Sequence, residues 1–194
     1  MEESKKKKEN EARLGRRFLH FTIVADEYGN WWMGEAKAGE TAEQCRARAL
    51  AEAADMGFSP YGGFEKAQEG DMWYCCTEGE CGPGYAMAVR IDEAAMSELK
   101  YITFYMDPEG RIGRLLNTAF LKDASVKAKE MLYRRGYDLV SDDCGEWEPR
   151  SRFELREYPG TFGMCVDRTV WAKKDRSTPD DDAEYWQFRG FVIG

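Results

Sequence analysis

The feature that most constrains this chain is an internal repeat about 80 residues long. Residues 18–30 read FLHFTIVADEYGN, and residues 99–111 read LKYITFYMDPEGR. A repeat on this scale indicates one supersecondary unit built twice, so the fold should be sought within one copy first. With a shift of 81 positions, the matching pairs are Phe21 and Ile102, Thr22 and Thr103, Ile23 and Phe104, Asp26 and Asp107, and Gly29 and Gly110.

Each copy opens with two predicted strands around a D-x-x-G turn. An aspartate can accept hydrogen bonds from the backbone just after it, and a glycine tolerates the left-handed conformation that closes a hairpin. The second strand of each hairpin is expected over residues 31–38 in the first copy and 111–120 in the second.

A helix follows each hairpin. Thr41 with Gln44 three residues later forms a capping-box signature, which predicts a helix over residues 41–56. In the second copy Asp123 is the predicted N-cap of a helix that ends near Arg135. Both helices end in glycine and an aromatic residue, Gly57-Phe58 and Gly136-Tyr137.

Further strands are predicted after each helix, which gives an α+β fold. The expected architecture is two tandem ββα-ββ repeats, with antiparallel sheets each covered on one face by one helix and related by a pseudo-twofold axis. The predicted strands are 72–76 and 85–91 in the first copy, 152–158 and 162–172 in the second, and a last strand at 185–193. The predicted boundaries are a charged N-terminal arm at 1–17, an acidic first repeat at 18–98, a mildly basic second repeat at 99–174, and an acidic loop with the last strand at 175–194.

Charge is unevenly distributed along a chain of net charge −8. Residues 18–98 hold fifteen acidic and five basic side chains, whereas residues 99–174 hold twelve acidic and fourteen basic ones. The N-terminus lacks the apolar stretch of a signal peptide, and no apolar run approaches the roughly 18 residues that cross a bilayer. We therefore expect a cytoplasmic protein with no membrane contact.

Residues that could support metal or covalent chemistry are few. The chain has one histidine, His20, which the strand register predicts to face away from Phe21 and Ile23, outward or at an interface. Six cysteines without a secretory signal should be reduced thiols. The sequence predicts no metal site and no cofactor, with zinc as the alternative; the zinc candidates are Cys76, Cys81, Cys144 and Cys165.

Catalytic motifs are missing from the sequence. The glycine-rich segment 79–84 leads into a strand rather than a helix, so it does not form a phosphate cradle. Residues 180–182 lack the glycine and the closing glutamate of a calcium loop. We therefore expect a binding protein rather than an enzyme.

The leading hypothesis is a contact surface in the first repeat that combines acids with aromatic anchors. Such a surface would fit the basic groove of a nucleic-acid enzyme. A homodimer is a further expectation, because duplicated sheets can leave strand edges exposed. The predicted contact residues are Trp31, Trp32, Glu35, Glu43, Glu52, Asp55 and Trp73.

The alternative hypothesis is a nucleic-acid-binding module in the second repeat, assisted by the N-terminal lysines. Clustered cations neutralise phosphates, and interleaved aromatic rings can stack on bases. The predicted contact residues are Arg111, Arg114, Lys122, Lys127, Lys129, Arg134 and Arg135.

In size, acidity and missing catalytic motifs, the chain resembles small proteins carried by phages and mobile elements. Anti-CRISPR proteins are among them, and several such proteins bind and block host defence nucleases. This resemblance covers the general profile and no specific residues. It implies a role as an inhibitor that occupies a protein partner in the host cytosol.

Overall fold

The computed structural model describes residues 17–26, 30–67, 71–80, 82–96, 98–142, 145–157 and 164–193. The charged arm at 1–16, together with Cys81 and Cys144, lies outside these residues. The fold is α+β with two antiparallel sheets, which confirms the predicted class.

The first sheet and its helix are built from residues 18–92. The strand order is β2-β1-β7-β6-β4, with the short strands β3 and β5 pairing with β1 and β6. Helix α2 spans Ala42–Asp55. The strands are β1 Phe18–Asp26, β2 Trp31–Met33, β3 Lys37–Ala38, β4 Phe58–Pro60, β5 Glu65–Lys66, β6 Met72–Gly79 and β7 Gly82–Asp92.

The second sheet and its helix follow after a short helix α3, Glu93–Met96. The strand order is β11-β10-β12-β13-β8-β9, and helix α4 spans Leu121–Arg134. The strands are β8 Tyr101–Met106, β9 Ile112–Thr118, β10 Leu139–Ser141, β11 Glu148–Pro149, β12 Met164–Lys173 and β13 Glu184–Val192, with 3-10 turns η1 Arg150–Arg152 and η2 Asp180–Asp182.

The two sheets have the same arrangement of strands. Strand β1 lies between β2 and β7, and strand β8 lies between β9 and β13 in the same way. Beyond them, β6 and β4 in the first sheet match β12 and β10 in the second. This shared order agrees with the repeat seen in the sequence, while a duplication and a pseudo-twofold axis stay predictions.

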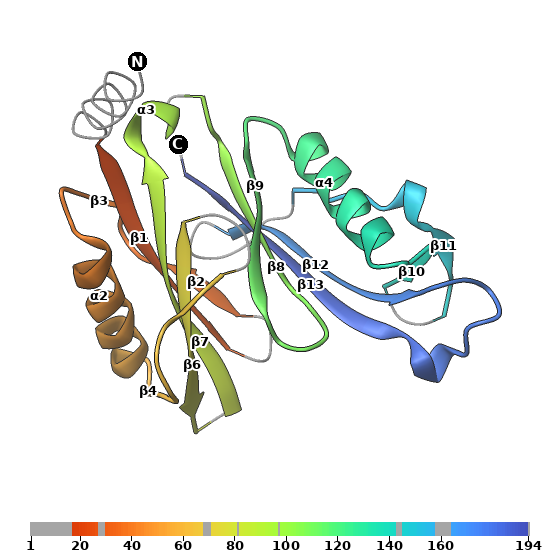
Figure 1. Ribbon diagram of the computed structural model, residues 1–194, viewed down its shortest axis with the longest axis horizontal. Helices are drawn as coiled ribbons and strands as arrows, with labels where there is room; N and C mark the ends of the chain where they lie inside the picture. The colour runs from red at the N-terminus through yellow and green to blue at the C-terminus, as the bar shows by residue number, and fades with distance from the viewer. Residues whose placement is uncertain are drawn as a thin grey trace, which may run out of the picture.

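The sheets pack face to face, and each helix covers the opposite face of its own sheet (Figure 1). Phe21 and Ile23 of β1 share one buried cluster with Ile102 and Phe104 of β8, so this cluster lies between the sheets. Val24 of β1 instead packs in a cluster with the α2 alanines. Alternating side chains on β1 therefore face the sheet interface or α2.

Helix α2 begins as the sequence predicts. Thr41 accepts a hydrogen bond from the Gln44 backbone N at 3.2 Å, and the Gln44 side chain accepts from the Thr41 backbone N at 2.8 Å. The prediction for α4 is wrong at its start, because Phe120 is the N-cap residue and caps with no side-chain hydrogen bond. Asp123 instead lies in the first turn and accepts from the Thr118 hydroxyl at 3.2 Å.

The predicted strand at 152–158 is absent over its described residues, 152–157. Phe153 and Leu155 are buried and produce the alternating pattern, but they pack in the α4 cluster. The Leu155 backbone N donates to Ser125 Oγ of α4 at 2.8 Å rather than to a neighbouring strand. The alternation thus reflects packing beneath a helix.

The last strand belongs to the second sheet rather than to a separate tail. Strand β13 lies between β12 and β8, and Phe188 pairs with both Arg168 and Tyr105. The second unit therefore runs from β8 to β13, and the predicted division at residue 174 falls inside it. None of the helices in the described ranges is long and apolar enough to cross a membrane.

Candidate functional site

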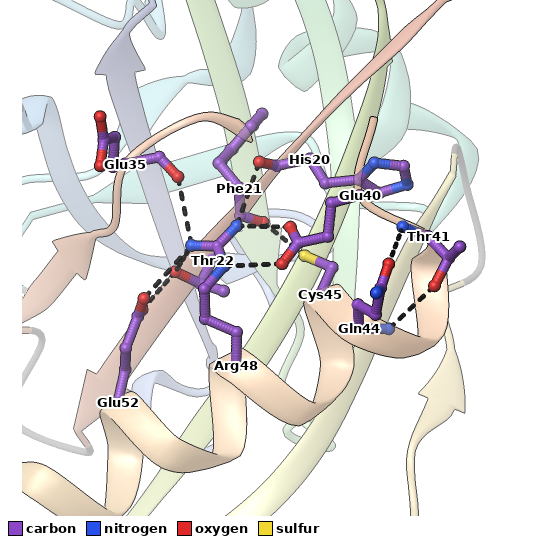
Figure 2. A network of polar contacts seen from close by, with 10 residues as sticks. All are labelled: His20, Phe21, Thr22, Glu35, Glu40, Thr41, Gln44, Cys45, Arg48 and Glu52. Carbon is purple, nitrogen blue, oxygen red and sulfur yellow. Dashed lines mark hydrogen bonds and ion pairs between the residues drawn. The ribbon is translucent and has the colours of Figure 1, made fainter. Parts of the chain in front are cut away.

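A network of charged groups joins α2 to β1, centred on Arg48 (Figure 2). The Arg48 guanidinium donates from Nε to Glu40 Oε1 at 3.0 Å and from Nη2 to Glu40 Oε2 at 2.8 Å. Its Nη1 reaches Glu52 Oε1 at 3.2 Å on the other side. Its remaining bonds go to the Thr22 hydroxyl and to the backbone oxygens of His20 and Glu35.

This network fixes a helix to its sheet. The hydrogen bonds from Arg48 hold the pKa of Glu40 below its usual value, so Glu40 is a carboxylate at neutral pH. Glu52, predicted to face a partner, is half-buried and accepts from Arg48 and from the Thr22 hydroxyl. That prediction is corrected: the Glu52 carboxylate is used inside the protein.

His20 is buried beneath the start of α2 rather than exposed. The side chain does face away from Phe21 and Ile23, but α2 covers that face, and only 4% of His20 is exposed. Neither ring nitrogen has a hydrogen-bond partner among the described residues, and burial lowers the pKa of His20. The imidazole is therefore neutral at pH 7.

Cys45 lies close to His20 but offers no catalytic thiolate. Its Sγ contacts the Phe21 backbone oxygen at 3.4 Å, and burial raises the pKa of the thiol to about 11. A thiol with that pKa stays protonated at neutral pH, and only the thiolate is a strong nucleophile. The His20–Glu40–Cys45 grouping does not have the features of a cysteine-nucleophile site.

The predicted aromatic anchors are largely internal. Trp31 is 2% exposed and packs between the sheets, with ring centroids 6.2 Å from Phe104 and 6.4 Å from Phe191. Its proposed role as a surface anchor is therefore wrong. Trp32 is half-buried against the α2 cluster. Trp73 is half-buried, and the guanidinium carbons of Arg46 and Arg90 lie 5.6 and 5.9 Å from its ring centroid.

The remaining predicted acids are exposed, two of them at opposite ends of α2 and the third before β3. Glu43 is in the first turn of α2, and Asp55 is the last residue of that helix. Glu35 precedes β3, and its backbone oxygen rather than its carboxylate accepts the hydrogen bond from Arg48. Trp31 is in the core and Glu52 is half-buried in the Arg48 network, so two of the seven predicted residues are used within the protein, while a partner contact of the other five stays a prediction.

Two of the predicted basic residues are also internal contacts. Arg111 donates from Nε to buried Asp107 at 2.7 Å and pairs with Glu109 at 2.7 Å. Arg114 donates to the Arg90 backbone oxygen at 3.1 Å, and burial lowers its pKa to about 10. The prediction of phosphate contact is corrected for the buried Arg114, whereas the Arg111 side chain is 42% exposed and its phosphate contact stays a prediction.

The other five predicted cations all lie on α4 or at its end. Lys127 pairs with Glu130 at 2.9 Å, and Arg135 lies 3.7 Å from Asp107. Lys122, Lys129 and Arg134 have no ion-pair partner among the described residues. The structure therefore places these five cations on one helix, and three of them form no ion pair among the described residues, although Arg134 interacts electrostatically with Glu130.

The outer face of α4 also carries large exposed apolar groups. Spacings of four, three and four residues place Lys122, Val126, Lys129 and Tyr133 on one side of the helix. Val126 is 51% exposed and Tyr133 is 63% exposed, and Phe120 at the helix start is 61% exposed. We use "outer face of α4" for the five residues Phe120, Lys122, Val126, Lys129 and Tyr133.

Cations lie over both aromatic rings of this face. Lys122 Nζ is 5.3 Å from the Phe120 ring centroid, and the Arg150 guanidinium carbon is 4.7 Å from the Tyr133 ring centroid. The sequence did not single out Phe120 or Val126. The helical spacing of Ala124, Ala128 and Leu132 does place Val126 and Tyr133 away from the buried side of the helix. This spacing could have indicated from the sequence that both side chains are exposed.

The zinc candidates that the structure describes do not lie together. Cys76 is exposed on β6, whereas Cys165 is buried in the core of the second unit, where burial raises the pKa of its thiol to about 11. Cys81 and Cys144 lie outside the described residues. Within the part of the chain that the structure describes, no group of three or more metal-ligating side chains occurs.

Comparisons with known proteins assign neither a family nor a function to this chain. No protein-family model, curated protein or solved structure matches this chain. Its function is therefore argued from its own residues, and the outer face of α4 is the strongest candidate site.

Proposed function

We propose that this chain is a non-enzymatic binding protein that acts by occupying a protein partner, and that the outer face of α4 is its contact surface. The observation that supports this is the exposure of three large apolar side chains, Val126 and Tyr133 on α4 and Phe120 at its N-cap. Single exposed apolar residues are common, but a group of them framed by charge marks interaction surfaces.

Burial of these side chains would supply the binding energy. Apolar surface removed from water stabilises a complex, and burying a side chain of this size contributes about 1 to 2 kcal/mol. Aromatic residues and arginine are enriched at the centres of protein interfaces. Tyr133 under Arg150 provides such a pair at one end of the helix, and Phe120 with Lys122 provides a similar one at the other.

The charge of this face indicates the chemistry of the partner. Lys122 and Lys129 lie beside Val126 without acidic partners among the described side chains. The surface therefore complements an acidic strip with apolar residues, rather than the basic groove expected from the sequence. That the partner is a nuclease of host defence stays a hypothesis drawn from the general profile of the chain.

Affinity capture from the cells that naturally express the protein tests this proposal. One protein should be retained after nuclease treatment, should bind again in purified form at a fixed stoichiometry, and should be lost with Val126→Asp. Ala51→Asp is the matched control, because Ala51 is an exposed residue in the middle of α2. Equal loss with both variants, or a partner that ignores Val126→Asp, would contradict the proposal.

Nucleic-acid binding is the second candidate, supported by Lys122, Lys129 and Arg134, three cations that form no ion pair among the described residues. Each cation that neutralises a phosphate steepens the salt dependence, so three of them predict a log–log slope of about −3. Retention on DNA or RNA with that slope, reduced stepwise by substituting each cation with glutamine, would favour this candidate over the first.

A further inference from the structure

A cavity of about 280 Å³ lies along one flank of α4, separate from the outer face of that helix. Strands β8 and β9 contribute Tyr105 and Leu115 to its lining. The α4 residues that line it, together with Arg135 at the helix end, are Lys127, Glu130, Met131 and Arg134. We propose that this cavity binds an apolar carboxylate: an aliphatic chain or side chain that carries a carboxyl group at one end.

The inner part of the cavity is lined by the Tyr105 ring and by the apolar side chains of Leu115 and Met131. Tyr105 is 3% exposed and Leu115 is 8% exposed, and both belong to the buried core of the second unit. Met131 packs against the same core from α4. Methionine adapts to ligands of different shape because its side chain is unbranched and flexible. These three side chains would contact the hydrocarbon part of the ligand.

The opening of the cavity is cationic. Lys127 and Glu130 neutralise each other through an ion pair of 2.9 Å. Arg134 has no ion-pair partner among the described residues, although its charge, after that of Lys127, also lowers the pKa of Glu130. Arg135 lies 3.7 Å from Asp107, and its guanidinium carbon is 5.7 Å from the Trp186 ring centroid. Guanidinium groups bind carboxylates with paired hydrogen bonds, so Arg134 is positioned to hold the charged end. Arg135 contributes positive charge beside it.

The size of the cavity limits the ligand further. Sites for cofactors and drug-sized molecules occupy about 300 to 1,000 Å³, so this one lies at the small end of the range. One medium-length aliphatic acid or one terminal residue of a peptide fits this volume. The same chemistry can come from a free fatty acid or from the C-terminal leucine of another chain.

Two probes separate these sources: octanoate, and a hexapeptide that ends in leucine with a free carboxyl group. Each is titrated into the full chain by calorimetry, with octanamide and the C-terminally amidated peptide as uncharged counterparts. We expect a carboxylate probe to bind at least tenfold more tightly than its amide. Binding of octanoate alone assigns the site to a small molecule, and binding of the peptide alone assigns it to a chain terminus.

The site is tested by substituting the cation that faces the ligand. Arg134→Gln should weaken binding at least tenfold, whereas Lys129→Gln should change it less than twofold. Both variants remove one positive charge from α4, but Lys129 does not line the cavity. Thermal unfolding of each variant verifies the fold.

The inference is overturned if neither carboxylate binds, if the amides bind as tightly, or if the two variants are affected equally. It does not depend on the proposed protein partner. Octanoate can bind the cavity when capture through Val126 fails, and the reverse outcome is equally distinguishable.

Discussion

Asp26 and Asp107 hold their hairpin turns by the same two hydrogen bonds, each from the residue four positions later. Asn30 donates to Asp26 from its backbone N at 2.8 Å and from Nδ2 at 2.7 Å. Arg111 donates to Asp107 from its backbone N at 2.8 Å and from Nε at 2.7 Å. These aspartates occupy matching positions in the predicted repeat, and each fixes its hairpin turn through the same pair of hydrogen bonds.

The two aspartates should nevertheless differ in their contribution to stability. The Asp107 side chain is fully buried and contacts Arg135 as well as Arg111, whereas the bonds that Asp26 accepts from Asn30 lie at an exposed turn. We expect Asp107→Ala to lower the free energy of unfolding by about 2 to 3 kcal/mol and Asp26→Ala by about 1 kcal/mol. Urea denaturation at pH 7 measures both, and equal losses would contradict this reading.

Much of the fold could be predicted from local patterns along the chain. The capping box at Thr41 and the glycine ends of both helices are set by residues within one turn, so they can be recognised in the sequence. The structure differs where packing at a distance decides. Phe153 and Leu155 alternate like a strand, yet Ser125 of α4 takes up the Leu155 backbone N–H.

The candidate site was harder to predict, because exposure depends on which sheet faces meet. Trp31 and Trp32 are adjacent, so their side chains point to opposite faces of β2. Only the packing of the two sheets on each other reveals that Trp31 lies in the core. The α4 cations were found from the sequence, whereas the exposure of Phe120 was not, because that residue precedes the helix.

The correction at Trp31 predicts a contrast with its neighbour. Trp31→Ala should lower the free energy of unfolding by about 3 to 5 kcal/mol, since it leaves a large cavity between the sheets. Trp32→Ala should have a smaller effect, because that side chain is only half-buried. Chemical denaturation monitored by far-UV circular dichroism measures this difference. A Trp31→Ala variant as stable as wild type would place that ring outside the core.

His20 should make stability depend on pH near neutrality. Burial holds its pKa in the folded state below the ordinary value of 6.5. The unfolded chain therefore binds more protons just below pH 6.5, and stability falls as pH decreases through that value. Glu40 and Asp71 oppose this effect of burial, while Arg48 and Arg90 add to it.

His20→Leu should remove that dependence. The chain has one histidine, so the difference in unfolding free energy between pH 7.5 and 5.5 should shrink in the variant. At pH 7.5 we expect stability to be retained or raised by about 1 kcal/mol, because neither ring nitrogen bonds to any side chain or backbone group in the described part of the chain. An unchanged difference between the two pH values would show that His20 is not the responsible group.

The Arg48–Glu40 pair should matter for stability mainly because removing one partner lowers the free energy of unfolding. Arg48→Met leaves the Glu40 carboxylate, whose side chain is 12% exposed, without its two hydrogen bonds. Removing one member of a buried pair costs about 3 kcal/mol, because the other charge stays desolvated. Glu52→Gln should cost less, since Glu52 is more exposed and its contact with Arg48 is single.

Acid titration distinguishes this account from a simple loss of packing. In the wild type Arg48 keeps the pKa of Glu40 below its ordinary value of 4.5. The pair therefore stabilises the fold above pH 4.5, and this contribution is lost as pH falls through the lower, folded-state pKa. In Arg48→Met the desolvated carboxyl should instead bind a proton more readily when folded, so the penalty should diminish on acidification. Adding Glu40→Gln to Arg48→Met should recover part of the stability at pH 7. If the double variant is no more stable than Arg48→Met at pH 7, an unpaired carboxylate is not the source of the loss.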